Sequence, residues 1–466
     1  LAWQHNLTAN ADLLIYGCDV AATPEGRDFV ASLANLTEAD VAASADTTGS
    51  TEFGGNWDLE FSTGQLETPA VFTADIQQNW FGKLAVINVT TFQDVVDGNV
   101  SSVSNLLANK GSDGFISLRE AILAVNAGAG GDTINLTAGT YTLSITGVGE
   151  DAAASGDLDI RKTMTIFGTG SGNSIINANG IDRVFHVLGA NGQLTLMNLT
   201  VQGGNAGSGA GGGLLVATGA NQLTLNSVVV SGNFAANGAG IDNAGTLSLM
   251  DVTISNNGNQ VSTSQGGGLR NTANASLNRV TLSGNQADSG GGIYNNFGTG
   301  NLTLTNITVS GNTAASAGGG LYTPDPVTII NSTFTQNTSD SGGGIRTQSA
   351  GATVSLKNTI VAGNIGTTAN PDLSGTFLSS GNNLIGNGTG QSNLVNGVNG
   401  DKVGTSGTPI NPSLGSLQGN GGKTNTHALL AGSSAINAGT ATGSPTTDQR
   451  DVSRVGQIDI GAYEYV

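Results

Sequence analysis

The stretch Leu302-Thr-Leu-Thr-Asn-Ile-Thr-Val-Ser-Gly-Asn312, followed by Gly318-Gly-Gly-Leu321, decides the fold because both phrases recur along the chain. Apolar residues alternate within the first phrase, which is strand periodicity. The asparagines that close its copies are 24 to 28 residues apart and stand at Asn233, Asn257, Asn285, Asn312, Asn337 and Asn364. A unit of this length without a helix cannot bury its apolar face alone, so the copies must stack on one another.

Stacking of such units predicts a right-handed parallel β-helix, one coil per repeat, over residues 131–410. Successive coils would lie roughly 4.8 Å apart, the spacing of hydrogen-bonded strands. We expect each recurring asparagine to occupy a left-handed turn and to hydrogen-bond the asparagine one coil away. The triple glycines would form bends without room for a side chain. A second internal polar column is predicted two residues after the apolar residue that follows each glycine bend: Val216, Asn243, Asn271, Asn295, Thr323 and Thr347.

The segments that flank the repeats are predicted to close the ends of the solenoid. Residues 84–130 contain a strand and an amphipathic helix from Ser117 to about Asn126, with Leu118, Ile122 and Val125 on one face. An open solenoid end exposes strand edges and core, so this helix is expected to cap the N-terminal end. Residues 411–466 carry no repeat and are expected to form C-terminal coils and the opposite cap.

The first 83 residues differ in charge from the remainder. They hold 12 acids and 2 bases, a net charge of −10, out of −18 for the 466 residues. Asp12 to Gly17 reads as a strand, Thr23-Pro24-Glu25 as a helix start, and Val41 to Ser44 as a further strand. This order predicts a small α/β unit in which Cys18 lies just beyond the C-terminal end of a parallel strand, where α/β folds place their sites.

Leu14-Ile-Tyr-Gly-Cys-Asp-Val-Ala21 and Gly54-Gly-Asn-Trp-Asp-Leu-Glu60 resemble the C-terminal half of a domain of unknown function from large bacterial, often cyanobacterial, surface proteins. That domain is similar to caspase-like cysteine peptidases, which implies that Cys18 stands at the nucleophile position. The family's histidine sits in a His-Gly turn, whereas His5 is followed by Asn6 here. A thiol without its base is a poor nucleophile, so we favour a structural Cys18 and keep a peptidase remnant as an alternative.

Phe334-Thr-Gln-Asn337 and the Gly-Gly-x-Ile phrases resemble the repeats of polymorphic outer-membrane proteins. Ser117-Leu-Arg-Glu-Ala-Ile122 and Asp459-Ile-Gly-Ala-Tyr-Glu464 resemble the flanks of a wider group of bacterial surface β-helix proteins. These resemblances imply an extracellular or cell-surface protein with a structural or adhesive role. They also imply partners: further copies of the chain, as in a filament or a surface lattice, or cell-surface polysaccharide.

Composition excludes several other functions. Only 10% of the residues are charged and the net charge is negative, which argues against nucleic acid as a partner. No apolar run approaches the roughly 18 residues that span a bilayer.

Parallel β-helices include polysaccharide lyases and hydrolases, which need several carboxylates in one cleft. The acids between Arg183 and Gly400 fall at different phases of the repeat, so we expect no catalytic site and no cofactor, with a lyase or hydrolase as the alternative: Asp242, Asp251, Asp288, Asp325, Asp340 and Asp372.

Two further groups of residues are weighed as sites. Asp157 and Asp159 alternate along one strand beside Arg161 and Lys162, and an ion pair or a turn is favoured over a metal site. His186 is interpreted as a satisfied or exposed histidine rather than a base. A column of residues is expected to point outward and could form a contact stripe, although ordinary solvent-facing residues are favoured: Arg270, Tyr294, Tyr322 and Arg346.

Overall fold

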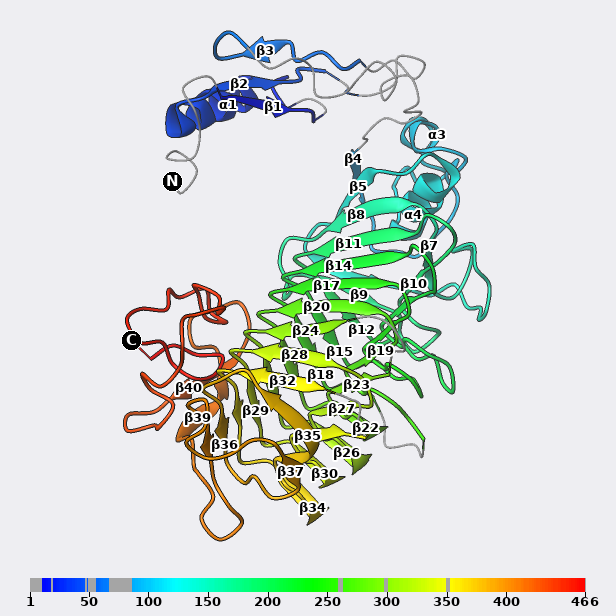
Figure 1. The fold of residues 1–466 in the computed structure, drawn as a ribbon. Coiled ribbons are helices and arrows are strands. Elements are labelled where there is room, and N and C mark those ends of the chain that lie inside the picture. The colour runs from blue at the N-terminus through cyan, green and yellow to red at the C-terminus, as the bar shows by residue number, and fades with distance from the viewer. Residues whose placement is uncertain are drawn as a thin grey trace.

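The computed structural model of the chain describes residues 11–17, 20–46, 48, 56–66, 86–258, 263–296, 301–348 and 353–465. A small N-terminal α/β sheet precedes a long parallel β-solenoid (Figure 1). The predicted fold class, mainly β with a parallel solenoid and a small α/β unit before it, is confirmed. Among the described residues, no helix combines the length and the apolar character needed to cross a membrane.

The N-terminal unit is a three-stranded sheet with one helix, built from β1 (Asp12–Ile15), α1 (Pro24–Thr37), β2 (Asp40–Ala43) and β3 (Phe61–Ser62). β1 and β2 run parallel, and α1 connects them. The helix starts where the sequence predicted it, because Thr23 Oγ1 accepts a hydrogen bond from the Gly26 amide at 3.1 Å and Pro24 follows. Cys18 lies outside the described residues.

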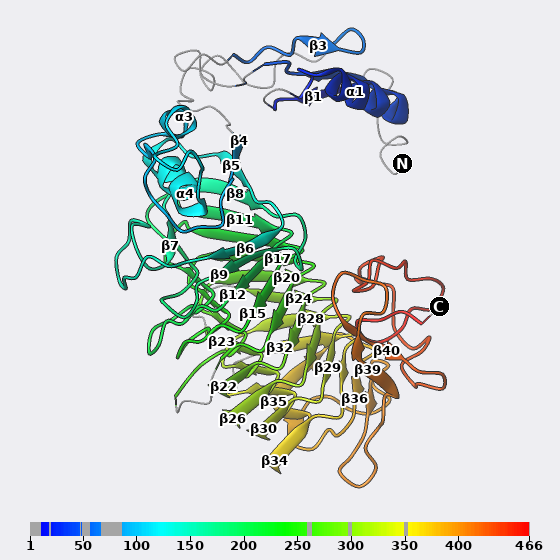
Figure 2. The same cartoon turned by 180° about the vertical axis from the view of Figure 1, so that it is seen from behind.

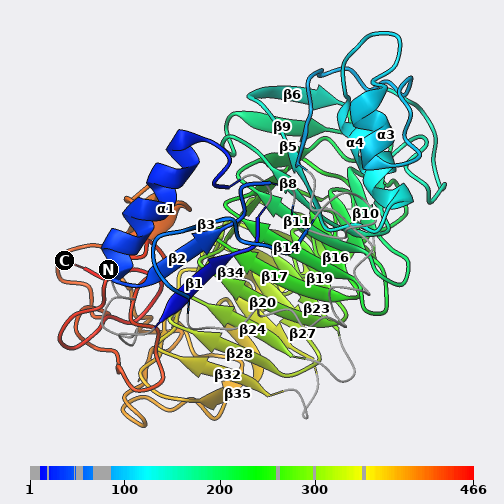
Figure 3. The same cartoon turned by 90° about the horizontal axis from the view of Figure 1, so that it is seen from above.

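The N-terminal end of the solenoid carries the helices α3 (Val103–Ala108) and α4 (Leu118–Ala127), which lie against each other (Figure 3). α4 begins at a capping box between Ser117 and Glu120. Ile122 and Val125 are fully buried in the apolar core of the solenoid. The amphipathic face predicted from the sequence is therefore the face that packs on the first coils.

Three columns of parallel strands form the body of the solenoid (Figures 1 and 2). The first column contains β4 (Val86–Asn88), β5 (Asp132–Asn135), β8 (Thr163–Phe167), β11 (Gln193–Met197), β14 (Gln222–Asn226), β17 (Thr246–Met250), β20 (Asn274–Asn278), β24 (Leu302–Thr305), β28 (Val327–Ile330), β32 (Val354–Lys357) and β35 (Leu373–Ser379). The second column contains β6 (Gly139–Thr142), β9 (Ser174–Asn177), β12 (Thr200–Gln202), β15 (Val229–Ser231), β18 (Thr253–Ser255), β21 (Thr281–Ser283), β25 (Thr308–Ser310), β29 (Thr333–Thr335), β33 (Ile360–Val361), β36 (Leu384–Ile385) and β38 (Lys402–Val403).

The third column joins the first at β35, so the two form one 20-stranded sheet. It contains β7 (Leu158–Ile160), β10 (Phe185–Val187), β13 (Leu214–Val216), β16 (Ile241–Asn243), β19 (Leu269–Asn271), β23 (Ile293–Asn295), β27 (Leu321–Thr323) and β31 (Ile345–Thr347). The later coils add a fourth, shorter column of β22 (Gln286–Ser289), β26 (Thr313–Ala317), β30 (Thr338–Ser341) and β34 (Ile365–Ala369). β37 (Gln391–Ser392) pairs with β35 at the end.

Each coil pairs residue by residue with the next, as in Leu302 with Val327 and Val309 with Phe334. The alternating apolar residues point inward and form one continuous core along the solenoid. The second residue of the glycine bend has no room for a Cβ, since a Cβ on Gly319 would lie 2.5 Å from the carbonyl oxygen of Thr338 on the next coil. The bends are therefore close approaches between coils, as expected from the repeat.

The ladder asparagines do not adopt the left-handed conformation that we expected, and this prediction is wrong. The residue before each of them does: Gly232, Asn256, Gly284, Gly311, Gln336 and Gly363 have φ between 55° and 71°. The chain turns the corner at that residue, and the following asparagine then directs its amide into the coil, where it is buried. Left-handed residues also stand between the first and second columns, as at Asn306 with φ 51° and Asn331 with φ 47°.

The C-terminal segment differs from its prediction as well. It does not cap the last coil: its hairpin, β39 (Leu414–Gln418) and β40 (Thr426–Leu429), lies beside the second column (Figure 1). Leu429, Ala435 and Ile460 pack on Ile360 and Leu384 of that column. The outer face of the second column is apolar at Ile360 and Leu384 and carries threonine hydroxyls on the preceding coils. The C-terminal segment covers this face, which the repeats themselves leave open.

Candidate functional site

The outward-facing residues of the third column form one continuous row. The parallel register places Asp159 beside His186, and each later residue of the row follows one coil further on. In order from the N-terminal end, the row is Asp159, His186, Leu215, Asp242, Arg270, Tyr294, Tyr322 and Arg346. The solenoid thereby brings together chemistry-bearing side chains that are far apart in the sequence.

The middle of this row is an ion pair. Arg270 Nε donates to Asp242 Oδ2 at 3.0 Å, and the Asp242 side chain is almost completely buried. Burial raises the pKa of Asp242, and the charge of Arg270 opposes that rise. The carboxylate is thus held by a neighbour in its own row and does not face an open cleft.

The next two members of the row are stacked tyrosines. The rings of Tyr294 and Tyr322 have centroids 5.1 Å apart and an interplanar angle of 19°. Each residue is only 7% exposed, because Ala317 of β26 packs against both rings. Desolvation raises the pKa of the Tyr322 hydroxyl, which donates to Gln348. The row therefore differs from the solvent-facing stripe that we expected: Arg270 and Arg346 are half-buried and both tyrosines are covered.

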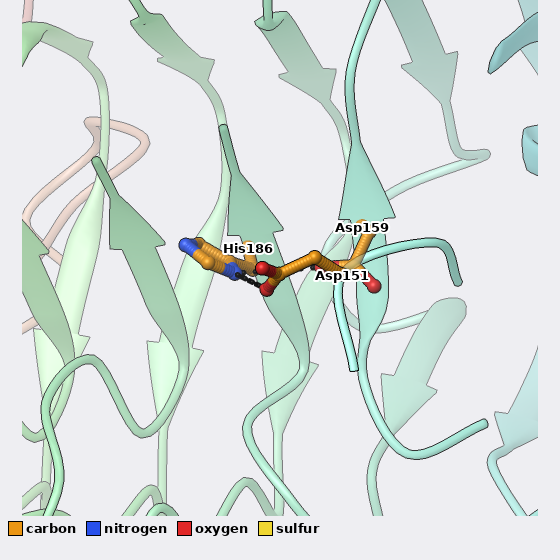
Figure 4. A group of neighbouring side chains, drawn as sticks. All are labelled: Asp151, Asp159 and His186. Atoms are coloured by element: carbon orange, nitrogen blue, oxygen red, sulfur yellow. Dashed lines mark ion pairs between the residues drawn. The ribbon is translucent and has the colours of Figure 1, made fainter. Parts of the chain in front are cut away.

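A cluster of three possible ligands lies at the N-terminal end of the row (Figure 4). His186 Nδ1 is 3.4 Å from Asp159 Oδ1 and 3.5 Å from Asp151 Oδ1. Asp159 comes from β7, His186 from β10 and Asp151 from the connection before β7. The ligand atoms of the three residues lie within 4.8 Å of one another.

Asp157, which we had paired with Asp159 as a metal candidate, is engaged elsewhere. Arg183 Nη1 donates to Asp157 Oδ2 at 2.8 Å. Burial and the neighbouring charge of Asp159 raise the pKa of Asp157 to about 7, against the lowering effect of Arg183. Of the two aspartates singled out in the sequence, Asp159 joins the cluster and Asp157 forms the ion pair that we favoured.

Sequence reasoning missed Asp151 as a member of the cluster and did not connect His186 with Asp159. Asp151 stands in an irregular connection, where no periodicity indicates which way a side chain points. His186 follows Asp159 by 27 residues, the length of one coil, and this spacing is the signal that could have paired them.

The recurring asparagines form an unbroken chain of hydrogen bonds. Asn285 Nδ2 donates to Asn312 Oδ1 at 2.9 Å, and Asn312 Nδ2 donates to Asn337 Oδ1 at 2.9 Å. The same acceptor oxygens receive the backbone amides of the previous coil, and the other amide hydrogen goes to a backbone carbonyl one coil back. The ladder runs through Asn233, Asn257, Asn285, Asn312, Asn337 and Asn364.

A carboxylate ends this ladder. Asp372 Oδ1 accepts from both the backbone amide and the side-chain amide of Asn364, at 3.0 and 2.8 Å. Its Oδ2 accepts from the Asn387 amide at 2.7 Å. The second polar column is a shorter chain in which Asn243 donates to Asn271, Asn271 to Asn295 and Asn295 to the Thr323 hydroxyl. Both chains are buried inside the coils.

The two parts of the chain match two family descriptions. Residues 1–84 match a domain of unknown function, DUF4347, and residues 279–296 and 306–324 match the Chlamydia polymorphic membrane protein repeat. The N-terminal region is thus similar to DUF4347, and two stretches of the β-solenoid are similar to the polymorphic membrane protein repeat. No curated protein matches this chain in sequence.

Two solved structures are similar to this chain at low identity. The pectate lyase Pel9A has a TM-score of 0.47 and 15% identity, over 82% of this chain and 96% of that chain. The A-module of the mannuronan C-5 epimerase AlgE4 from Azotobacter vinelandii has a TM-score of 0.37 and 18% identity, over 64% of this chain and 86% of that chain. Likenesses at such scores and identities say nothing about the activity of this chain.

Proposed function

We propose that this chain is a non-catalytic structural or adhesive module of a bacterial cell-surface protein, in which the solenoid acts as a rigid body. The DUF4347 region would be part of a caspase-like domain that has lost its activity. The match of the repeats to a family named for membrane proteins supports an extracellular or cell-surface location. The domain limits that we propose remain 1–83, 84–130, 131–410 and 411–466.

The observation that carries this proposal is that five carboxylates of the later coils are each engaged in a separate bond. Asp242 is paired with Arg270, and Asp251 with Arg279 through two bonds of 2.6 and 3.0 Å. Asp372 is committed to the asparagine ladder. Asp288 and Asp340 accept from the hydroxyls of Ser316 and Thr367, respectively. A polysaccharide lyase or hydrolase needs carboxylates that converge on substrate, and these five lie apart in separate bonds.

The hydrogen bonds inside the coils favour a stable and rigid solenoid. Every ladder asparagine uses both amide hydrogens and its carbonyl oxygen within the coils, so an opening of one coil would leave several buried polar groups unpaired. The C-terminal segment adds contacts along the outer face of the second column. Such a body suits a spacer or a scaffold more than an enzyme with moving parts.

The end of the solenoid offers a surface for association between copies. β34 is the edge strand of the four-stranded sheet on the C-terminal side, and Ile365 at its start is 54% exposed. An exposed edge strand presents backbone donors and acceptors that can pair with another chain. We infer that copies associate through this end, as in a filament or a surface lattice.

Sedimentation velocity over a range of concentrations, with electron microscopy of the same samples, tests the association. Wild type is expected to form concentration-dependent oligomers, and Ile365→Lys should reduce them because a charge on an edge strand opposes pairing. Val148→Lys is the matched control, since Val148 is 76% exposed and stands in the connection between β6 and β7, near the first coils. Wild type that stays monomeric at every concentration would contradict this part of the proposal.

The non-catalytic part is tested with acidic polysaccharides and with a protein substrate. Incubation with the purified chain should release neither unsaturated nor reducing ends, and Cys18→Ala should leave any proteolysis unchanged. Release of such ends by wild type would revive the polysaccharide enzyme, and proteolysis that is lost in Cys18→Ala would revive the peptidase.

A further inference from the structure

Asp151, Asp159 and His186 place two carboxylate oxygens and one imidazole nitrogen around a common point without a hydrogen bond among them. The distances from His186 Nδ1 are 3.4 Å to Asp159 Oδ1 and 3.5 Å to Asp151 Oδ1. Charge-assisted N–H···O bonds have donor–acceptor distances of about 2.7–2.9 Å. The three groups are thus arranged next to one another but are not bonded as donor and acceptor.

We propose that Asp151, Asp159 and His186 bind a divalent transition-metal ion, for which Zn²⁺ is the probe. Zinc binds histidine nitrogen at about 2.0–2.1 Å and carboxylate oxygen at about 2.0–2.2 Å, almost always in tetrahedral geometry. Two ligand atoms of such a site are roughly 3.3–3.5 Å apart, which follows from these bond lengths and the tetrahedral angle. The two distances from His186 Nδ1 equal this ligand-to-ligand spacing.

Asp159 supplies an independent indication of a cation. Its side chain is completely buried, and Oδ1, the oxygen that points at the cluster, has no hydrogen-bond donor. His186 Nδ1 is likewise buried without a hydrogen bond. A buried carboxylate oxygen that lacks a donor is costly unless a positive charge neutralises it. Two carboxylates and a neutral imidazole carry a charge of −2, which one divalent ion balances.

The neighbouring bonds orient the ligands. The other oxygen of Asp159, Oδ2, accepts from the Ala153 amide at 2.7 Å, so the carboxylate cannot rotate freely. Hydrogen bonds to a ligating carboxylate of this kind fix its orientation in metal sites. The register of β7 and β10 sets Asp159 beside His186. These two ligands are therefore preorganised on the rigid part of the fold.

The third ligand, Asp151, comes from the connection before β7, and hydrogen bonds hold this connection in place. Arg119 of α4 donates through Nη1 to the carbonyl oxygen of Ala153 at 2.9 Å. Glu150 accepts from the amides of Ala152 and Ser155 at 3.1 and 3.0 Å. Asp151 itself is 66% exposed, which leaves a path for the ion and a position for water. Binding would attach this connection to the first coils of the solenoid.

Zn²⁺ titration of the full chain by calorimetry tests the site. All variants carry Cys18→Ser, because a thiolate is a competing zinc ligand. One ion per chain is expected, and Asp159→Asn or His186→Ala should weaken its affinity by more than about 100-fold, beyond the loss typical of an outer-shell partner. Asp340→Asn, a carboxylate on β30, is the matched control and should bind as the Cys18→Ser parent does.

Co²⁺ provides a second readout that does not depend on stability. Its visible absorption should show a tetrahedral complex in the parent and lose that band in Asp159→Asn, which preserves side-chain size. Circular dichroism of the metal-free variants verifies that they fold. The site is disproved if Zn²⁺ does not bind stoichiometrically to the folded parent, or if binding persists unchanged in folded Asp159→Asn and His186→Ala.

Discussion

The hydroxyl of Thr308 donates to Oε1 of Gln449 at 2.6 Å, across 141 residues of sequence. The amide of Gln449 donates in turn to the hydroxyls of Thr281 and Thr424, at 2.9 and 3.0 Å. Thr281 and Thr308 stand on neighbouring coils, in β21 and β25. A single glutamine that is 1% exposed thus connects two coils of the solenoid to the C-terminal segment.

Gln449→Ala should detach the C-terminal segment more easily. The change removes both a donor and an acceptor and leaves buried hydroxyls unpaired, so we expect a loss of about 2–4 kcal/mol in the free energy of unfolding. Limited proteolysis should cleave residues 411–465 faster than in wild type. Gln418→Ala, at an exposed position of β39, is the control. Equal cleavage rates in both variants would contradict the role of Gln449.

Asn312→Ala should destabilise the solenoid strongly. Asn312 accepts from the backbone and side-chain amides of Asn285 and donates to Asn337 and to the carbonyl oxygen of Leu282. The substitution leaves these buried groups unpaired, at about 1–3 kcal/mol for each. Urea unfolding measures the loss, which should be at least about 3 kcal/mol. Asn296→Ala changes an exposed asparagine and should cost far less.

Asp242 should make stability depend on pH. Because burial raises its pKa in the fold above the unfolded value of about 3.9, the folded chain binds more protons between these two values. The contribution of Asp242 to the free energy of unfolding is greatest below about pH 3.9, and it is lost as pH rises through the pKa that Asp242 has in the fold. Asp242→Asn should remove this part of the pH dependence, as seen in the difference between urea midpoints of wild type and variant from about pH 4 to 7. Parallel curves would show that Asp242 titrates normally.

His427 should act in the opposite direction. It is buried, with Nε2 2.8 Å from the Ser310 hydroxyl and Nδ1 2.6 Å from the carbonyl oxygen of Gly415. The carbonyl can only accept, so Nδ1 carries the proton and Nε2 accepts from Ser310. Burial lowers the pKa of His427 below the unfolded value of about 6.5. Its stabilising contribution is present above that pH and is lost as pH falls towards and through the folded pKa.

Acidification below about pH 6.5 should therefore loosen the packing of the C-terminal segment on the second column. The protection factors of the amides of residues 411–465, measured by hydrogen exchange from neutral to mildly acid pH, report this change. His427→Gln should reduce the pH dependence of these protection factors. A variant with the same pH dependence as wild type would assign the effect to another group.

The sequence alone predicted the parallel coils, because inward residues alternate along each strand and the same phrase returns once per coil. It also predicted that Asn285, Asn312 and Asn337 would meet, since a residue that recurs at one phase of a repeat must stack on its copies. The sequence also predicted a helix from Ser117 by its amphipathic face, and the structure has α4 begin there at a capping box with Glu120. All of these features depend on neighbours in sequence or on the period.

Only the tertiary structure decided the features that have no period. The corner conformation fell one residue before each ladder asparagine, because the direction of a side chain depends on the path of the whole coil. The C-terminal segment lies along the second column because Thr281, Thr308 and Ile360 form a face that exists only after the coils have stacked. Asp151 meets His186 through an irregular connection whose course follows from packing against α4. The repeat determined the body of this protein, and long-range packing determined where its non-repeating parts lie.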